Sequence, residues 1–197
     1  IHTHPGSHAG YYPGAKTMAL KLLVDPRTGD ILGAQGVGED GVDKRIDVIA
    51  TAMRAGLVAP ELLDLELAYA PPFGSAKDPI NMLGYVADNV MTGSDRLVQW
   101  HQVEGLVADG VRLVDVRTPS EFARGHLPSA LNIPVDDLRE HLEELQGSRV
   151  LVYCQVGMRG HTASMLLRGH GIDASNLSGG WLTWSTSPAG TSHTKAV

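Results

Sequence analysis

The chain has 197 residues, which is long enough for one large or two small domains. Its formal net charge of −6 argues against a nucleic-acid partner, and 43% hydrophobic with 19% charged residues is an ordinary globular composition. A single cysteine excludes an internal disulfide framework and a zinc site built from several cysteines, and it is typical of a reducing cytoplasm.

No apolar run approaches membrane-spanning length, and no signal peptide opens the chain. We therefore expect a cytoplasmic protein without a membrane partner. Because Ile1 is not a natural start, we interpret the sequence as a fragment of a longer protein.

Residues 1–14 are predicted to be a loop, because they combine prolines, glycines and three histidines. The histidines have no carboxylate nearby in sequence, so we expect no metal site. Tyr11 and Tyr12 are unusual on a loop and suggest contact with a ligand or another chain, with plain core packing as the alternative.

Periodicity and turn residues predict a hairpin followed by helices in the first half of the chain. The predicted elements are a strand from Met18 to Val24, a turn at 25–30, a strand at 31–37, an amphipathic helix from Val42 ended by Gly56, a short helix from Pro60 through Leu67, and a helix over 79–91 capped by Asp78. The polar segment 92–95 reads as a linker, so we place a domain boundary there.

Three segments of this half carry a resemblance to a known module. They are His8-Ala-Gly-Tyr-Tyr-Pro-Gly14, the strand Asp30-Ile-Leu-Gly-Ala-Gln-Gly36 of the hairpin, and Tyr69-Ala-Pro-Pro-Phe-Gly-Ser-Ala-Lys-Asp-Pro-Ile-Asn81. Residues 1–93 resemble the dimerisation domain of flavin-dependent pyridine nucleotide-disulfide oxidoreductases, in particular the coenzyme A-disulfide reductase and NADH oxidase branch.

The resemblance implies an α+β domain that forms a homodimer and closes the partner subunit's active site, with Tyr69 and either Tyr11 or Tyr12 reaching the partner's thiol chemistry. It implies FAD, NADH and coenzyme A for the full-length protein. We find no phosphate-binding glycine fingerprint in this chain, so we expect no cofactor in the fragment itself.

In the second half, short strands alternate with short helices, which predicts an α/β domain with a central parallel sheet. The predicted elements are a short helix at 100–110, a strand at 112–117, a helix capped by Thr118 and Glu121, an extended segment at 125–134, a helix from Leu138 to Leu145, a strand at 150–153, a helix from Thr162, a last short helix at 178–184 and a frayed tail at 187–197. Ligands bind at the carboxyl ends of such strands, where Asp115 and Cys154 are expected.

The lone cysteine lies at a predicted strand-to-helix turn. Cys154 follows an apolar strand, and the two glycines and the arginine of Gln155–Gly160 predict a loop before the helix. Backbone N–H groups and the positive end of a helix favour an anion there, so a thiolate nucleophile is expected. The alternative is a small buried hydrophobe at a strand end, but Gly157 and Arg159 favour the reactive interpretation.

Four segments of this half resemble a rhodanese domain over residues 97–190. They are Asp115-Val-Arg-Thr-Pro-Ser-Glu-Phe, Gly125-His-Leu-Pro-Ser-Ala-Leu-Asn-Ile-Pro, Val152-Tyr-Cys-Gln-Val-Gly-Met-Arg159 and Gly179-Gly-Trp-Leu-Thr-Trp184. The resemblance implies that Cys154 carries sulfane sulfur as a persulfide, taking it from small sulfur donors and passing it to acceptor thiols.

The loop residues Gln155, Val156, Gly157, Met158, Arg159 and Gly160 are candidate substrate-binding residues, because their N–H groups can cradle an anionic sulfur. Arg159 either binds the donor or pairs with Glu121. Asp115 and Arg117 are expected to hold the loop scaffold.

The predicted function is sulfur transfer through Cys154 within a larger FAD- and NADH-dependent coenzyme A-disulfide or persulfide reductase. A non-catalytic dimerisation module is the first alternative. A cysteine phosphatase is less favoured, because those enzymes have five residues between cysteine and arginine, and here only four separate Cys154 from Arg159.

Overall fold

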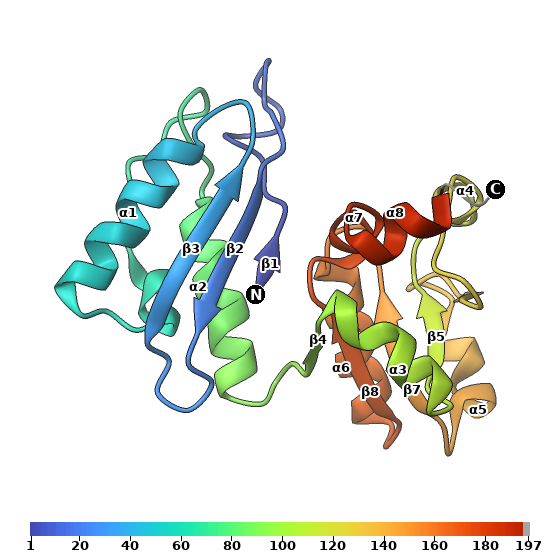
Figure 1. The fold of residues 1–197 in the computed structure, drawn as a ribbon. Helices are drawn as coiled ribbons and strands as arrows, with labels where there is room; N and C mark the ends of the chain where they lie inside the picture. Colours follow the sequence, from blue (N-terminus) through green and yellow to red (C-terminus); the bar gives the residue numbers. More distant parts are fainter. Residues whose placement is uncertain (195–197) are drawn as a thin grey trace. The chain divides into compact units, whose positions relative to one another are not determined.

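The computed structural model describes residues 1–194, and contacts divide the chain into two compact units, Ile1–Ser94 and Asp95–Val197 (Figure 1). The first unit is built on an antiparallel sheet and the second on a parallel sheet, in agreement with the predicted fold classes.

The sheet of the first unit has the order β1-β2-β3. The predicted hairpin is confirmed as β2 (Ala19–Val24) and β3 (Ile31–Val37), which pair antiparallel with Leu20 opposite Gly36. β1 (His2–Thr3) pairs with β2 and corrects the expectation that residues 1–14 are entirely loop. A strand of two residues is too short to produce a recognisable alternation in sequence.

The helices of this unit are α1 (Val42–Ala55), the 3₁₀ helix η1 (Ala59–Asp64) and α2 (Pro79–Met91). α1 ends where Gly56 adopts a φ of 79°, and α2 begins where the Asp78 carboxylate accepts the Ile80 N–H at 3.0 Å. The predicted short helix after Pro60 is a 3₁₀ helix that ends before Leu67. α2 places Ile80, Leu83 and Ala87 against the core leucines of β2.

The second unit has a five-stranded parallel sheet in the order β4-β8-β7-β5-β6. The strands are β4 (Leu97–Val98), β5 (Arg112–Asp115), β6 (Leu131–Asn132), β7 (Arg149–Tyr153) and β8 (Asp173–Leu177). β8 was not predicted, because its sequence Asp-Ala-Ser-Asn-Leu is polar and lacks strand-forming residues. β7 is the central strand, and Val150 to Tyr153 are fully buried.

Short helices connect these strands. They are η2 (Trp100–Gln102), α3 (Val103–Ala108), α4 (Pro119–Ala123), η3 (Leu138–His141), α5 (Leu142–Leu145), α6 (Met158–Gly169), α7 (Gly180–Ser185) and α8 (Pro188–Thr194). α8 corrects the prediction of a frayed tail from residue 187 up to residue 194, and the last three residues of that prediction lie outside the described part. Within residues 1–194, every helix is too short or too polar to cross a membrane.

Candidate functional site

Cys154 is the first residue after β7, at the carboxyl end of the central strand of the second unit. The turn that follows is short. Gly157 adopts a φ of 105°, which favours glycine, and α6 begins at the next residue, Met158. The Gly157 N–H donates to Cys154 Sγ at 3.2 Å. A backbone donor on the sulfur stabilises its anionic form.

The predicted loop is therefore shorter than expected. Met158, Arg159 and Gly160 belong to the first turn of α6 rather than to a loop. The helix therefore begins four residues before the predicted start at Thr162. The first N–H groups of a helix have no partner within it, so these three residues direct donors toward the carboxyl end of β7. The expected cradle of N–H groups is thus partly a helix terminus.

A second helix holds the carbonyl groups of the same turn. The N–H groups of Trp181 and Leu182, at the start of α7, donate to the carbonyls of Cys154 and Gln155 at 2.8 and 3.0 Å. A Cβ on Gly180 would lie 2.3 Å from the Cys154 carbonyl oxygen, so glycine is required for this approach. Sequence reasoning treated this segment as a helix start and missed its contact with the cysteine turn.

Cys154 is 1% exposed and belongs to the hydrophobic cluster around β7. This burial agrees with the alternative of a small core residue, whereas reactive cysteines are usually partly exposed. The N–H donor on Sγ and the helix terminus are not needed to pack a core cysteine. Met158, the first residue of α6, is 63% exposed.

Arg159 is paired with Glu121. Its two terminal nitrogens donate to the two carboxylate oxygens of Glu121 at 2.8 and 2.7 Å, and Thr118 caps α4 beside them. These hydrogen bonds lower the pKa of Glu121 to about 2. The pKa of Arg159 is raised, chiefly by Glu121 and to a smaller extent by the charge of Cys154. Of the two predicted roles, the structure favours bracing the turn.

The pH dependence of this pair follows from the lowered pKa of Glu121. A carboxyl whose pKa falls on folding stabilises the folded state above its unfolded value of 4.5 and loses that contribution as the pH falls toward 2. The brace is therefore intact at neutral pH.

Asp115 and Arg117 form a buried ion pair that supports the turn. Their side chains are 0% and 2% exposed, and Arg117 Nη2 lies 2.7 Å from Asp115 Oδ2. Arg117 also donates to the Gln155 side chain at 3.2 Å and to the Gly125 carbonyl at 2.7 Å, and it lies over the Trp181 ring. This arrangement agrees with the predicted scaffold role.

Sequence reasoning missed a buried polar cluster next to the turn. Asp95 accepts the Asn176 side-chain N–H at 3.2 Å, and Asn176 also donates to the Gly157 carbonyl at 3.1 Å. Asp95 had been assigned to a linker, and Asn176 lies in the strand that was not predicted. No sequence signal connects two residues that are 81 positions apart.

The comparisons with known proteins divide the chain at the same two halves. Residues 2–79 match the family model described as pyridine nucleotide-disulphide oxidoreductase, dimerisation domain, and residues 99–187 match the one described as rhodanese-like domain.

The chain is an oxidoreductase dimerisation domain followed by a rhodanese-like domain.

Two solved structures match both halves of the chain, and a curated relative matches a stretch of 87 residues. The crystal structure of reduced Bacillus anthracis CoADR-RHD is 46% identical with a TM-score of 0.92, over 94% of this chain and 34% of that one. The NAD-dependent persulfide reductase from A. fulgidus is 34% identical with a TM-score of 0.83, over 93% and 33%. The coenzyme A disulfide reductase of Staphylococcus haemolyticus is 46% identical over 87 residues, 44% of this chain and 20% of the relative. The chain thus spans about a fifth to a third of these proteins.

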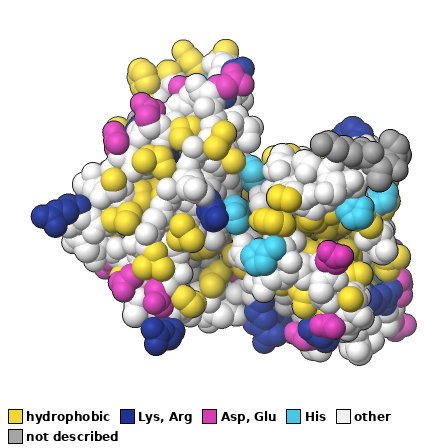
Figure 2. All heavy atoms as spheres, in the orientation of Figure 1, with side chains coloured by type: hydrophobic (Ala, Val, Ile, Leu, Met, Phe, Trp, Pro, Cys, Tyr) yellow, Lys and Arg dark blue, Asp and Glu magenta, His cyan; other side chains and the backbone are white. Residues whose placement is uncertain are grey.

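The predicted tyrosines of the dimerisation domain are at its surface. Tyr11 and Tyr69 are 77% and 53% exposed, and their hydroxyls lie 3.5 Å apart. This contact raises the pKa of Tyr11. Tyr12 instead packs edge-on against His8. Apolar side chains also reach the surface of this domain over β2 and β3 (Figure 2), among them Leu32 and Val37.

The spacing G-x-G-x-x-G does occur once, at Gly36, Gly38 and Gly41, which corrects the expectation that the chain lacks it. It runs from the end of β3 to the N-cap of α1, but β3 is antiparallel to its neighbour. A Cβ on Gly36 would lie 2.6 Å from Val42, and one on Gly38 would lie 2.9 Å from Met18. The space next to these glycines is filled by side chains of the same domain. A dinucleotide phosphate therefore does not fit at this turn.

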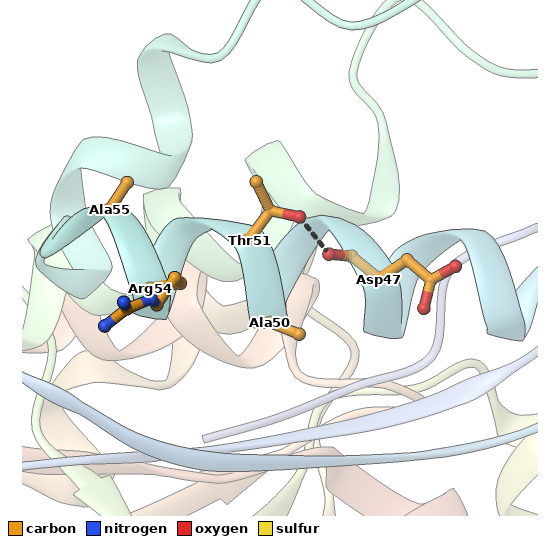
Figure 3. Close-up of a pocket in the computed structure, with 5 residues that line it drawn as sticks. All are labelled: Asp47, Ala50, Thr51, Arg54 and Ala55. Carbon is orange, nitrogen blue, oxygen red and sulfur yellow. Dashed lines mark hydrogen bonds between the residues drawn. The ribbon is translucent and has the colours of Figure 1, made fainter.

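A surface hollow of the dimerisation domain lies on the exposed side of α1 (Figure 3), lined by Asp47, Ala50, Thr51, Arg54 and Ala55. The Thr51 hydroxyl donates to the Asp47 carbonyl at 2.8 Å, as is usual within a helix. No group of histidines, cysteines or carboxylates within residues 1–194 is arranged to bind a metal. The hollow belongs to a different unit from Cys154.

We expect Arg159→Ala to slow sulfur uptake from thiosulfate and from a neutral organic persulfide by similar factors, of the order of tenfold. The reason is that Arg159 is engaged by Glu121 and braces the turn for both donors. Uptake rates are measured by intact mass, with Arg124→Ala, at the exposed C-cap of α4, as the control. Selective loss with thiosulfate would assign Arg159 to donor binding instead.

Proposed function

We propose that the chain transfers sulfane sulfur through a persulfide on Cys154. The observation that carries the proposal is the N–H donor from Gly157 to Cys154 Sγ, in a turn between a central parallel strand and a helix N-terminus. The match of residues 99–187 to the rhodanese-like family supports it.

Two displacements account for the chemistry. The Cys154 thiolate attacks the outer sulfur of a donor, the bond between that sulfur and the donor breaks, and the donor leaves as an anion. With thiosulfate the leaving group is sulfite, and with an organic persulfide it is a thiolate. An acceptor thiolate or cyanide then attacks the outer sulfur of Cys154, and the Cys154 thiolate is released. No external oxidant or base is required.

The chain's own groups stabilise the persulfide stage. The outer sulfur carries the negative charge, and the N–H groups from Gln155 to Gly160 are the donors in reach of it. Arg159 and Arg117 hold the turn through Glu121 and Asp115, so the donors need not reorganise during transfer.

Intact mass spectrometry tests the proposal, because Cys154 is the only thiol. Thiosulfate, polysulfide or coenzyme A persulfide should add one sulfur, about 32 Da, and cyanide should remove it as thiocyanate. Reduced, folded protein that takes up no sulfur from any of these donors would refute the sulfurtransferase proposal and leave a non-catalytic module.

A phosphatase reaction is less well supported. Four residues separate Cys154 from Arg159, and both terminal nitrogens of Arg159 are engaged by Glu121. A phosphate would need that arginine free. The same mass spectrometry experiment, with a phosphate ester in place of the sulfur donor, should give no adduct.

We also propose a setting for the chain. Its relatives include coenzyme A disulfide reductases and an NAD-dependent persulfide reductase, and it spans only part of each. The full-length protein would then be a cytoplasmic, homodimeric flavoenzyme using FAD, NADH and coenzyme A, with these cofactors bound outside this chain. The exposed aromatic residues Tyr11, Tyr69 and Phe73 are the candidate contacts to a partner subunit.

In the full-length protein, we expect Tyr69→Phe to lower the reductase activity about tenfold and to leave sulfur transfer by Cys154 unchanged. Tyr69 is 53% exposed, and within residues 1–194 its hydroxyl forms a hydrogen bond with that of Tyr11, so loss of the hydroxyl should not disturb folding. The two activities are assayed separately on one preparation, with Tyr85→Phe as the matched control. An equal loss of both activities would indicate a folding defect and contradict this role.

A further inference from the structure

We infer that Asp95 and Asn176 are positioning residues for the sulfur-transfer turn, an inference that rests on the proposed function of Cys154. The contacts form one path. Asp95 holds the Asn176 amide, Asn176 holds the Gly157 carbonyl, and the Gly157 N–H donates to Cys154 Sγ.

Both side chains of the path are buried, and Gly157 is half-buried. Asp95 and Asn176 are 5% and 3% exposed. The Asp95 carboxylate also accepts the Ser164 hydroxyl at 3.3 Å and lies 2.9 Å from His161 Nδ1. Ser164 and His161 belong to α6, the helix that starts at the cysteine turn. Asp95 therefore ties β8 and α6 together at the point where the turn is held.

The orientation of the Asn176 amide is determined by its neighbours. Both the Asp95 carboxylate and the Gly157 carbonyl are acceptors, so the amide nitrogen must face them. The amide oxygen then points the other way and has no hydrogen-bond partner within the described residues. A Cβ on Gly160 would lie 2.2 Å from that oxygen, so only glycine allows α6 to approach.

As core packing alone, Asp95 and Asn176 would lower the stability of the folded domain. A buried carboxylate and an unpaired amide oxygen each carry a desolvation penalty that an apolar side chain would avoid. What they provide is a second donor to the Gly157 carbonyl, which also accepts the His161 N–H of α6 at 2.8 Å. Gly157 has a φ of 105°, in a region where its two peptide groups could otherwise rotate easily. The carbonyl and the N–H of Gly157 belong to adjacent peptide groups, so a second donor on the carbonyl restricts the rotation at Gly157 that would turn its N–H away from Cys154.

A pair of variants separates positioning from simple packing. Asn176→Asp places a carboxylate against Asp95 and the Gly157 carbonyl, so both contacts are lost. In the double variant Asp95→Asn with Asn176→Asp, the new amide at 95 donates to the new carboxylate at 176. The contact between residues 95 and 176 returns, but the Gly157 carbonyl keeps only the His161 N–H and still lacks a side-chain donor.

The experiment uses the full 197-residue chain and measures the rate of persulfide formation from thiosulfate by intact mass, together with thermal unfolding. We expect Asn176→Asp to slow persulfide formation at least about tenfold. The double variant should regain the thermal stability of the original chain and remain slow. Asp173→Asn, in an exposed pair on the same strand, is the control and should match the original chain.

Two results would overturn the inference. One is persulfide formation in Asn176→Asp at the same rate as in the original chain. The other is a double variant that recovers both this rate and the thermal stability. Alkylation of Cys154 by iodoacetamide provides a readout that needs no sulfur donor. If the original chain takes up no sulfur, the proposed function fails, but slower alkylation in both Asn176 variants would still support the positioning role, and unchanged alkylation would exclude it.

Discussion

Cys154→Ser should abolish both sulfur uptake from thiosulfate and the release of thiocyanate with cyanide. A serine hydroxyl is a poor nucleophile without a general base, and residues 154–160 include no histidine or carboxylate. The substituted hydroxyl can still accept the Gly157 N–H, so the turn should keep its shape. Intact mass and the thiocyanate assay measure the two half-reactions separately.

Cys154→Ala is the companion variant, because it removes the acceptor as well as the nucleophile. Cys154→Ala should unfold near the temperature of the original chain because the residue is small, whereas Cys154→Ser buries a hydroxyl in the apolar cluster and should unfold at a somewhat lower temperature. A sulfur adduct that persists in Cys154→Ser would place the reactive group elsewhere and contradict the proposed mechanism.

Arg117→Leu should destabilise the rhodanese-like domain by about 3–5 kcal/mol. The substitution leaves the Asp115 carboxylate, which is 0% exposed, without its partner, and it removes the donors to Gln155 and Gly125. Denaturant unfolding followed by tryptophan fluorescence reports on this domain alone, because all three tryptophans lie beyond residue 95.

Arg112→Leu is the matched control for this experiment. Arg112 also lies on β5, but its pair with Glu144 is exposed, so the change should be within about 1 kcal/mol. The double variant Asp115→Asn with Arg117→Leu should recover part of the loss, because the unpaired charge is gone. An unfolding midpoint for Arg117→Leu equal to that of the original chain would show that the ion pair does not support the domain.

The sequence by itself determined the elements whose signals are local. The hairpin of β2 and β3, the helix α2 with its Asp78 cap and Pro79, and the capping box of Thr118 and Glu121 depend on residues within a few positions of each other. The same holds for Cys154, because an apolar strand, a left-handed glycine and a helix follow in one short stretch. Motif order along the chain was enough to predict both families.

Elements held by distant partners were missed. β8 has a polar sequence and is a strand because β7 and β4 pair with it on both sides. β1 is two residues long, and it is a strand because it pairs with β2. The glycine spacing from Gly36 to Gly41 shows the reverse case, where a local pattern is present and the antiparallel neighbour of β3 gives it a different use.

Only the tertiary structure decided how the turn around Cys154 is supported. The sequence left two roles open for Arg159, and the choice depends on Glu121, which lies 38 positions away. The contacts of Asp95 and Asn176 with the turn, and of α7 with the carbonyls of Cys154 and Gln155, join segments that no short-range pattern connects. Hydrogen-bond geometry between such segments is set by how the sheet and helices pack, so it can be determined only once the chain is folded.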